Sequence, residues 1–580
     1  MIESGPRLVH SAPSGLRPPE HDLDYPNHED GMSIGSGRER RRFAADIVIV
    51  GSGAGGAPAA RLLREAGFDV LLVEEGGLHR TETFRTDPIS SLQRLYRDAG
   101  TSSIMGRPPI MFAEGRCVGG STVINGGMSW RTPERVLDQW SSEFGLEQTD
   151  AASMARHFDE AQRILHVEHQ HPDTLGRNDA LFVAGANKLG WRVENNPRNM
   201  HRCVGLNNCG LGCPTGAKRS MLVTEIPRAL SAGTRLLSHA KVDRIRFRGG
   251  RAIGVRGHFV DERGRARNSG GRRLGKFEVE ADLVVLAAGA RHTPGILMRS
   301  FIFGGQVGRN LHTHPNAKVV GLFEEKIDAW VGAHQAHQIH QFLDDGILLA
   351  YAGVPPGILA TGIPGFGREH GERMALYNHM MAAGCLVEDT GVGRVVLGPD
   401  LQPWMTFQMS SRDVETVHRG VRMAAEQMFA AGARSVLLPF GDMPELHGAD
   451  ELVQIDRRPR KRHNIELVTV HIMSSTRMSR DKRGGVVDAW GRVHGVEGLT
   501  IADAGIIPSS IGVNPMETIV ALALRCAERW AEDLGRRRMR NPASPSPSTR
   551  AAGDAAAASQ GSGEYAAPAV PGAAAASMTS

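Results

Sequence analysis

The stretch that decides the fold is 46-DIVIVGSGAGGAPAARLLREAGFDVLLVEEGG-77. It contains two short β-branched runs, at 46–50 and 69–73, and a segment of helical length rich in Ala, Leu and Arg joins them. Two short apolar strands connected through a glycine loop and a helix form a β–α–β unit with parallel strands. Similar runs at 282–286 and 499–502 are further strand candidates. The sequence therefore predicts an α/β fold built on a parallel sheet.

The loop after the first run follows the pattern G-x-G-x-x-G. In this pattern Gly51 permits a tight turn, Gly53 lets the backbone approach a pyrophosphate, and Gly56 lets the helix pack against the strand. Glu74 follows the second run, 23 residues after Gly51, where an acidic side chain can accept hydrogen bonds from an unphosphorylated ribose. These residues predict a site for NAD or FAD and disfavour NADP.

The same region also resembles an export signal, because arginines at 40–42 precede an apolar run and small residues. A cleaved signal peptide does not require a second strand, or an acidic residue at the spacing that fits a ribose. Glycines also interrupt the apolar core that such a signal needs. We therefore favour the nucleotide loop and expect the protein in the cytoplasm.

Bulk composition narrows the class of protein. A chain of 580 residues exceeds the size of one hydrophobic core, so two domains are expected. No apolar run reaches 18 residues, and the net charge of +5 is small for this length, so neither membrane insertion nor nucleic-acid binding is indicated. The spacing of Cys203, Cys209 and Cys213 matches no common zinc or iron–sulfur pattern, and we expect no metal.

Four separated motifs carry a family resemblance: 115-GRCVGGSTVINGG-127, 283-LVVLAAGARHTPGILMRS-300, 307-VGRNLHTHP-315, and 471-HIMSSTRM-478 with 484-GGVVDAWGRVHGVEGLTIADAGIIPSSIGVNPMETIVALA-523. These motifs occur in the order seen in the glucose-methanol-choline (GMC) oxidoreductases, and the chain resembles this family over about residues 43–535. The segments 207-NNCGLGCPTGAKRS-220 and 512-GVNP-515 are more similar to the long-chain alcohol oxidase and sterol oxidase branches than to the glucose oxidase branch.

The resemblance implies a Rossmann-like FAD-binding domain with a parallel sheet, and a substrate domain with an antiparallel sheet flanked by helices. The expected division is a disordered tail at 1–42, an FAD-binding domain at 43–130, 225–315 and 470–535, a substrate-binding domain at 131–224 and 316–469, and a disordered tail at 536–580.

The resemblance also implies which residues contact FAD. Gly120, Ser121 and Asn125 match the loop at the flavin ring, Asp503 matches the aspartate at the ribityl or phosphate region, and Val242 matches a position whose backbone faces adenine. Some members attach flavin through a histidine in this loop, but Ile124 precedes Asn125 here. We therefore expect non-covalent FAD.

The family's catalytic base falls on His471 and its partner on Asn514. Oxidation of an alcohol to an aldehyde or ketone removes a proton from oxygen and a hydride from carbon. Because a hydroxyl is a very weak acid, we expect His471 to take the proton in step with hydride transfer to flavin N5. We assign the nearby His312 and His314 to packing or loop hydrogen bonds.

The substrate domain contains the Met-rich segments 378-NHMMAAGC-385 and 404-WMTFQMS-410, which favour an apolar pocket. We expect a hydrophobic alcohol, long-chain or sterol-like, with O2 or an external electron acceptor. A redox-neutral FAD-containing lyase of the same superfamily is the alternative.

Overall fold

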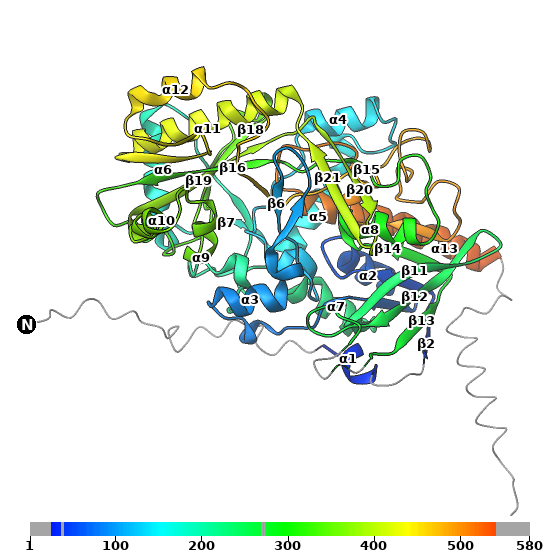
Figure 1. Ribbon diagram of the computed structural model, residues 1–580. Coiled ribbons are helices and arrows are strands. Elements are labelled where there is room, and N and C mark those ends of the chain that lie inside the picture. The colour runs from blue at the N-terminus through cyan, green and yellow to red at the C-terminus, as the bar shows by residue number, and fades with distance from the viewer. Residues whose placement is uncertain (1–24, 36–39, 268–270, 272, 541–580) are drawn as a thin grey trace, which may run out of the picture.

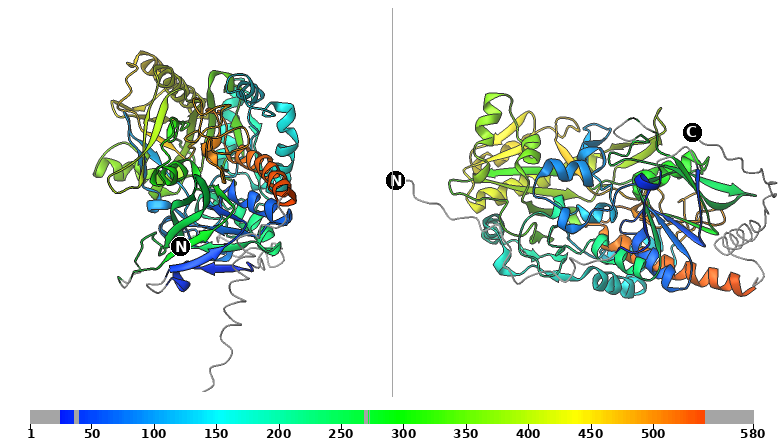
Figure 2. Two further views of the ribbon diagram at one scale, coloured as in Figure 1. Left: turned by 90° about the vertical axis from the view of Figure 1, so that its right-hand side faces the viewer. Right: turned by 90° about the horizontal axis from the view of Figure 1, so that it is seen from below.

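The computed structural model describes residues 25–35, 40–267, 271 and 273–540 (Figure 1). Two large sheets lie toward opposite ends of the molecule (Figures 1 and 2). Strands from distant parts of the chain meet in each sheet, so the two halves are interleaved along the sequence.

The first sheet confirms the predicted parallel sheet. Its six strands are all parallel, in the order β1 (His28–Asp30), β10 (Arg235–Ser238), β4 (Val70–Val73), β3 (Ile47–Val50), β14 (Leu283–Leu286), β25 (Leu499–Ile501). Every residue of β3, β4 and β14 is buried, as expected for a parallel sheet covered on both faces.

Helices cover one face of this sheet and a second, four-stranded sheet covers the other. The helix α2 (Gly56–Glu65) packs on β3 and β4, with α7 (Glu225–Ser231) and the long α13 (Met516–Arg540) beside it. The covering sheet has the order β11 (Ala240–Arg248), β12 (Arg251–Phe259), β13 (Lys276–Glu280), β2 (Arg40–Ala44).

The other large sheet confirms the expected antiparallel sheet flanked by helices. Its main path is β5 (Ser102–Ile104), β6 (Ile110–Phe112), β24 (Leu467–Thr469), β16 (Asn316–Leu322), β19 (Met380–Val387), β18 (Ile347–Ala352), β17 (His337–Ile339), β8 (Glu194–Asn195), with β22 (Ser435–Phe440) and β23 (Met443–Leu446) branching from β16. All its pairs are antiparallel except β24 with β6. The helix α11 (Ser411–Ala431) covers one face, with α6 (Arg177–Lys188) and α12 (Leu452–Arg457) packed against it.

The remaining elements are β7 (Val167–His169) paired with β9 (Pro197–Asn199), the three-stranded sheet β15 (Arg309–Leu311), β20 (Val392–Leu397), β21 (Pro403–Gln408), and the helices α1 (Gly31–Ile34), α3 (Pro88–Leu95), α4 (Glu134–Ser142), α5 (Ala151–Leu165), α8 (Gly289–Arg299), α9 (Pro356–Leu359) and α10 (Arg368–Met374).

The expectation of a disordered tail over 1–42 is wrong for the part that the structure describes. The strand β1 pairs with β10, and Asp30 accepts a hydrogen bond from His239 at 2.7 Å. Edge strands are held through backbone hydrogen bonds, which a polar sequence does not reveal. At the other end α13 continues to Arg540, beyond the expected boundary at 535. Residues 1–24 and 541–580 lie outside the described residues.

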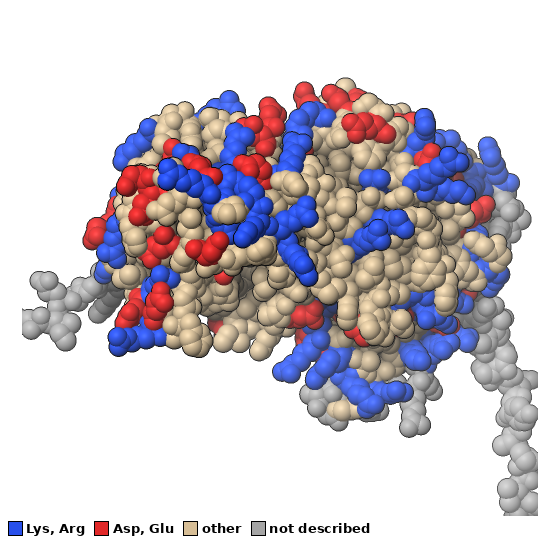
Figure 3. Space-filling view, turned by 45° about the horizontal axis from the view of Figure 1, so that its top comes forward, with Lys and Arg blue, Asp and Glu red and all other residues tan. Residues whose placement is uncertain are grey.

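The surface carries charges of both signs. On the face shown in Figure 3, Lys and Arg side chains are interspersed with Asp and Glu side chains. None of the helices in the described residues combines the length and the apolar character needed to cross a membrane.

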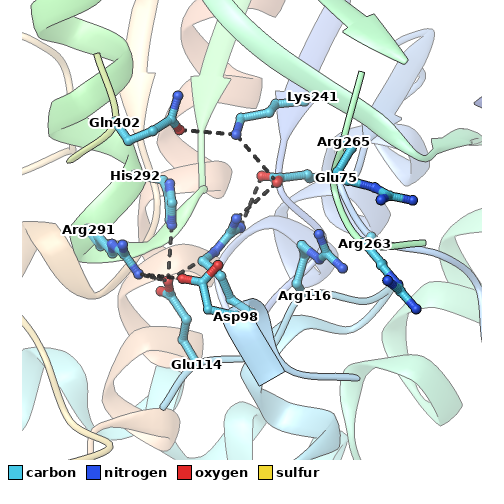
Figure 4. A network of polar contacts seen from close by, with 12 residues as sticks. Glu75, Asp98, Glu114, Arg116, Lys241, Arg263, Arg265, Arg291, His292 and Gln402 are labelled. Atoms are coloured by element: carbon cyan, nitrogen blue, oxygen red, sulfur yellow. Dashed lines mark hydrogen bonds and ion pairs between the residues drawn. The ribbon is translucent and has the colours of Figure 1, made fainter. Parts of the chain in front are cut away.

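A buried ionic network joins several elements of the nucleotide-binding half (Figure 4). The guanidinium of Arg97 donates to both carboxylate oxygens of Glu75, at 2.9 and 3.0 Å, and its Nε lies 3.0 Å from Glu114. Burial alone would raise the pKa of Glu75, but Arg97 and Lys241 outweigh it and hold this pKa well below its usual range. The network ties the end of β4 to the end of β6 and to β11.

The Glu114 carboxylate connects the network to α8. Arg291 donates to it at 2.9 Å, and Nε2 of His292 lies 3.1 Å from the same oxygen. Burial raises the pKa of Glu114, but its contacts with His292, Arg97 and Arg291 outweigh burial and hold this pKa below its usual range. Glu75 and Glu114 are therefore partly buried carboxylates that share Arg97 as a partner.

Replacing Arg97 should destabilise the fold because it leaves two buried carboxylates short of a partner. We expect Arg97→Met to lower the free energy of unfolding by about 3–5 kcal/mol, measured by urea denaturation. The control is Arg40→Met, which removes an exposed ion pair with Glu278 and should cost about 0–1 kcal/mol. Equal urea midpoints for the two variants would contradict this assignment.

Candidate active site

A cavity of about 530 Å³ lies between the carboxyl edge of the six-stranded sheet and the large mixed sheet. Because the six strands are parallel, the segments that follow β3, β4, β14 and β25 all reach this edge. Of the residues predicted from the sequence, all but Gly56 line the cavity: Gly51, Gly53, Glu74, Gly120, Ser121, Asn125, Val242, His471, Asp503 and Asn514. The structure thus brings the predicted site together.

The glycine loop has the shape that its pattern predicts. Gly51 has a φ of +104°, and a Cβ on Gly56 would lie 1.9 Å from the Gly51 oxygen, so Gly56 serves packing behind the loop. A Cβ on Gly53, in contrast, would meet nothing within 4 Å. The backbone at Gly53 is therefore open to close approach from the cavity.

Glu74, the acidic residue after β4, lines the cavity and also binds the backbone of the glycine loop. Glu74 lines the cavity, and its carboxylate accepts hydrogen bonds from the backbone N–H of Ser52 at 3.0 Å, the Ser52 hydroxyl at 2.7 Å and the N–H of Gly76 at 2.8 Å. Burial raises its pKa. Glu74 therefore fixes the phosphate loop as well as facing the predicted ribose position.

Asp503 anchors the next two segments of the same edge. One carboxylate oxygen accepts from Gly289 N–H at 3.0 Å and from the Thr293 hydroxyl at 2.5 Å, and the other accepts from Gly505 N–H at 2.8 Å. Burial raises the pKa of Asp503 to about 6. The residue thus links β25 to the start of α8 where both face the cavity.

The predicted flavin loop is held from behind by a lysine that the sequence analysis missed. The Lys218 ammonium donates to the carbonyl oxygens of Val123, Asn125 and Cys209, at 2.7, 2.7 and 2.8 Å. Asn125 lines the cavity, and among the described residues its buried Oδ1 has no hydrogen-bond partner. An unpaired amide oxygen in the cavity that also contains the open glycine loop fits a cofactor with a polar ring edge.

Cys209 and Cys213 of the 207–220 motif both contact Lys218. The Cys209 carbonyl accepts from Lys218, and the Cys213 sulfur accepts from the Lys218 N–H at 3.4 Å. Across the described residues, no three His, Cys, Asp or Glu side chains are grouped in a way that could hold a metal ion.

The predicted catalytic pair is brought together at the other end of the cavity. Nε2 of His471 lies 3.3 Å from Nδ2 of Asn514, and Nδ1 of His471 lies 3.2 Å from Nδ1 of His314. Burial lowers the pKa of His471 to about 3, and His314 contributes to the decrease. His471 is therefore a neutral imidazole at physiological pH.

His314 does more than the loop packing assigned to it from the sequence. Its Nε2 accepts hydrogen bonds from the backbone N–H groups of Ile511 and Gly512, at 3.3 and 3.1 Å. Burial lowers the pKa of His314 to about 4, so its ring is neutral and carries its one N–H on Nδ1. His314 consequently donates to Nδ1 of His471.

The buried Asp389 holds His314 in place. It accepts hydrogen bonds from the backbone N–H of His314 at 3.1 Å, from that of Thr313 at 3.2 Å and from the Ser510 hydroxyl at 2.9 Å. It also lies 3.0 Å from Nδ1 of His312. Asp389 therefore joins the 312–314 loop to the segment that carries Asn514.

These contacts determine where the proton of His471 lies at rest. Since Nδ1 accepts from His314, the proton of the neutral ring is on Nε2 and faces the Asn514 amide. Oδ1 of Asn514 is buried and has no hydrogen-bond partner in the described part of the chain. Turning the amide by 180° exchanges its oxygen and nitrogen, and the oxygen then accepts this proton from His471. The arrangement is a hydrogen-bonded chain that can engage an oxygen in the cavity.

Comparisons with known proteins identify the family of this chain. Family models described as GMC oxidoreductase match residues 92–316 and 391–523, and one described as an NAD(P)-binding Rossmann-like domain matches residues 49–86. An uncharacterized GMC-type oxidoreductase of Mycobacterium tuberculosis is 37% identical over 518 residues, which cover 88% of this chain and 80% of that protein. A long-chain-alcohol oxidase of Arabidopsis thaliana is 27% identical over 558 residues, covering 88% of this chain and 70% of that protein.

Solved structures share the fold. Pyridoxine 4-oxidase from Mesorbium loti superposes with a TM-score of 0.62 at 18% identity, covering 84% of this chain and 99% of that one. A formate oxidase of Aspergillus oryzae superposes with a TM-score of 0.63 at 16% identity, covering 85% and 99%. With the two family models and the mycobacterial relative, these findings confirm the resemblance: the chain belongs to the GMC oxidoreductases, which are FAD-dependent oxidoreductases acting on alcohols or similar donors.

Proposed function

We propose that this protein oxidises the CH–OH group of an alcohol to an aldehyde or ketone, with His471 receiving the hydroxyl proton and Asn514 contacting the substrate oxygen. The observation that carries the proposal is a neutral, buried imidazole beside an amide at one end of a cavity whose other end is an open phosphate loop. In this proposal residues 43–130, 225–315 and 470–535 bind FAD, and residues 131–224 and 316–469 bind the substrate.

When bound, FAD supplies the hydride acceptor. Gly53 and Glu74 would hold its nucleotide part, and Asn125, with the glycine-rich backbone beside it, would hold its ring. We propose that the binding is non-covalent, because Ile124 offers no nucleophile at the loop position where some relatives carry histidine. Acid precipitation should leave the yellow flavin in the supernatant, and a yellow pellet would show a covalent bond.

The low pKa of His471 determines how the proton can move. A hydroxyl is far more weakly acidic than an imidazolium whose pKa is about 3, so a free alkoxide would form only against a steep gradient. Proton transfer to His471 must therefore accompany the loss of hydride from carbon. Asn514 can stabilise the substrate oxygen during this step without adding a second titratable charge.

The hydrogen bond between His314 and His471 limits when His471 can act as a base. With its proton on Nε2, His471 can only donate a hydrogen bond to the substrate oxygen. To accept the hydroxyl proton at Nε2 it must carry its own proton on Nδ1, and His314 must then stop donating to that atom. His314 could free Nδ1 by moving its proton to Nε2, but Nε2 already accepts two backbone N–H groups, which oppose that move. His314 therefore controls whether His471 acts as a base or as a hydrogen-bond donor.

Two substitutions of His471 separate the base from the hydrogen-bond donor. A base is lost in both His471→Ala and His471→Gln, and we expect each to reduce the rate of flavin reduction by on the order of 10² or more. Glutamine keeps an N–H donor but cannot accept a proton at neutral pH. A glutamine variant within tenfold of wild type, beside an inactive alanine variant, would assign His471 the donor role. Flavin content should be equal in all three proteins.

The rate should not depend on His471 ionisation near neutrality. The base must be neutral, and a pKa lowered to about 3 keeps the ring neutral as the pH falls to about 5. We therefore expect His471 to add no acidic limb to kcat/KM between about pH 5 and pH 8, whereas Asp503, with its pKa raised to about 6, titrates within this range. An acidic limb near pH 6.5, the ordinary pKa of histidine, that persists in Asp503→Asn would contradict the neutral state of His471.

We further propose a hydrophobic alcohol as substrate, long-chain or sterol-like, O2 or an external acceptor as oxidant, and a cytoplasmic location. Support for the substrate comes from the apolar side chains lining the cavity on the large sheet, such as Leu348 and Leu386, and from the similarity to a long-chain-alcohol oxidase.

Anaerobic absorbance spectra test this function. The FAD-loaded protein is titrated with aliphatic, aromatic and sterol alcohols and then opened to air. We expect bleaching of the flavin band by a hydrophobic alcohol, and rapid recovery in air identifies O2 as the acceptor. Bound flavin that no alcohol reduces would contradict alcohol oxidation.

A further inference from the structure

The substrate half of the cavity contains a lysine without a counter-charge. Lys318 lies on β16 and lines the cavity. Across the sheet it stands in register with Gly384 of β19, which in turn pairs with Ala350 of β18. Since directly paired residues point to the same face, the ammonium is flanked by small residues that leave room beside it.

Within the part of the chain that the structure describes, no hydrogen bond or ion pair reaches the Lys318 ammonium. Burial lowers its pKa, and no neighbouring carboxylate counteracts that effect. The Asn316 Oδ1 on the same strand also lacks a partner, but a neutral amide oxygen cannot neutralise a charge. An ammonium without an opposite charge in such an apolar environment costs free energy, unless a bound ligand supplies that charge.

Two other cations in this neighbourhood, Lys218 and Arg198, are buried and donate hydrogen bonds to the protein. Lys218 donates to three carbonyl oxygens, and Arg198 donates to the Gln170 side chain at 2.8 Å and to the Gly126 carbonyl at 2.9 Å. His334 adds no charge, because burial and the cations Arg198, Lys218 and Lys318 lower its pKa to about 3. Lys318 differs from these groups in facing open space.

The acidic residues of the cavity cannot serve Lys318. Those that line it are Glu74, Glu75, Glu114 and Asp503, which belong to the nucleotide end, and all four already accept hydrogen bonds. Among the described residues that line the substrate half, Lys318 is therefore a cation without an acidic partner, set among apolar side chains such as Leu348 and Leu386.

We propose that Lys318 binds a carboxylate on the substrate, so that the alcohol oxidised at His471 is the hydroxyl end of an apolar hydroxy acid. This inference rests on the proposed alcohol oxidation and narrows its substrate class. Asn316 pairs with Val468, which lies on the strand that leads to His471. Lys318 is two residues farther along β16 than Asn316, which is a rise of about 7 Å along the strand. The carboxylate and the reacting hydroxyl are thus held at separate points of one cavity.

The reaction test compares substrates that differ only in charge. Anaerobic flavin reduction is measured with octan-1-ol and with ω-hydroxyoctanoate, and then with longer and shorter members of both series. We expect wild type to prefer the hydroxy acids, and Lys318→Met to lower kcat/KM for them by about 10-fold to 100-fold, as for loss of a charged hydrogen bond. Rates with the uncharged alcohols should change by less than threefold.

Two further variants serve as controls. Lys318→Arg keeps the charge and should retain the preference for hydroxy acids. Lys326→Met removes an exposed lysine from the same region of the chain and should behave as wild type. Equal losses for alcohols and hydroxy acids in Lys318→Met, or no preference in wild type at any chain length, would overturn the proposal.

A binding measurement tests Lys318 independently of turnover. Calorimetric titration of the FAD-loaded protein with octanoate, which carries no hydroxyl to oxidise, should show affinity that falls at least tenfold in Lys318→Met. If neither alcohols nor hydroxy acids reduce the flavin but octanoate binding depends on Lys318, alcohol oxidation fails and the carboxylate site stands. Equal octanoate affinity in both proteins would remove the carboxylate site.

Discussion

The parallel alignment of the six strands is the constraint on which the site depends. It brings the segments after β3, β4, β14 and β25 to one edge, although β14 and β25 lie far from β3 and β4 in the chain. Asp503 and Glu74 then tie these segments to one another through backbone N–H groups. The cavity is consequently a product of sheet topology, and the large mixed sheet closes it from the other side.

Three cations around this cavity differ in their partners. Arg97 pairs with carboxylates at the nucleotide end, and Lys218 is surrounded by carbonyl oxygens behind the flavin loop. Lys318 has neither kind of partner in the described chain. Because the first two groups are complete within the protein, they stabilise the fold, whereas the third is free to recognise a ligand. This contrast distinguishes structural cations from one suited to binding.

The sequence was sufficient for features encoded by neighbouring residues. The glycine loop, the strands around it and the motif containing His471 could be predicted because their residues are adjacent in the chain. His314 was visible in the motif LHTHP, but its contact with His471 spans 157 positions. Asp389 and Lys218 act over 75 and 93 positions, on His314 and Asn125, and no local pattern indicates such pairs. The strand β1 was missed because backbone pairing at a sheet edge leaves little trace in hydropathy.

A crystal structure of the FAD-loaded protein with a bound, non-reacting alcohol analogue would show where the flavin ring and the substrate oxygen lie. We expect the flavin ring between the Asn125 loop and the His471–Asn514 pair, with the analogue's oxygen within hydrogen-bond distance of both side chains. A ring bound elsewhere, or an analogue oxygen that contacts neither His471 nor Asn514, would contradict the proposed roles of these residues.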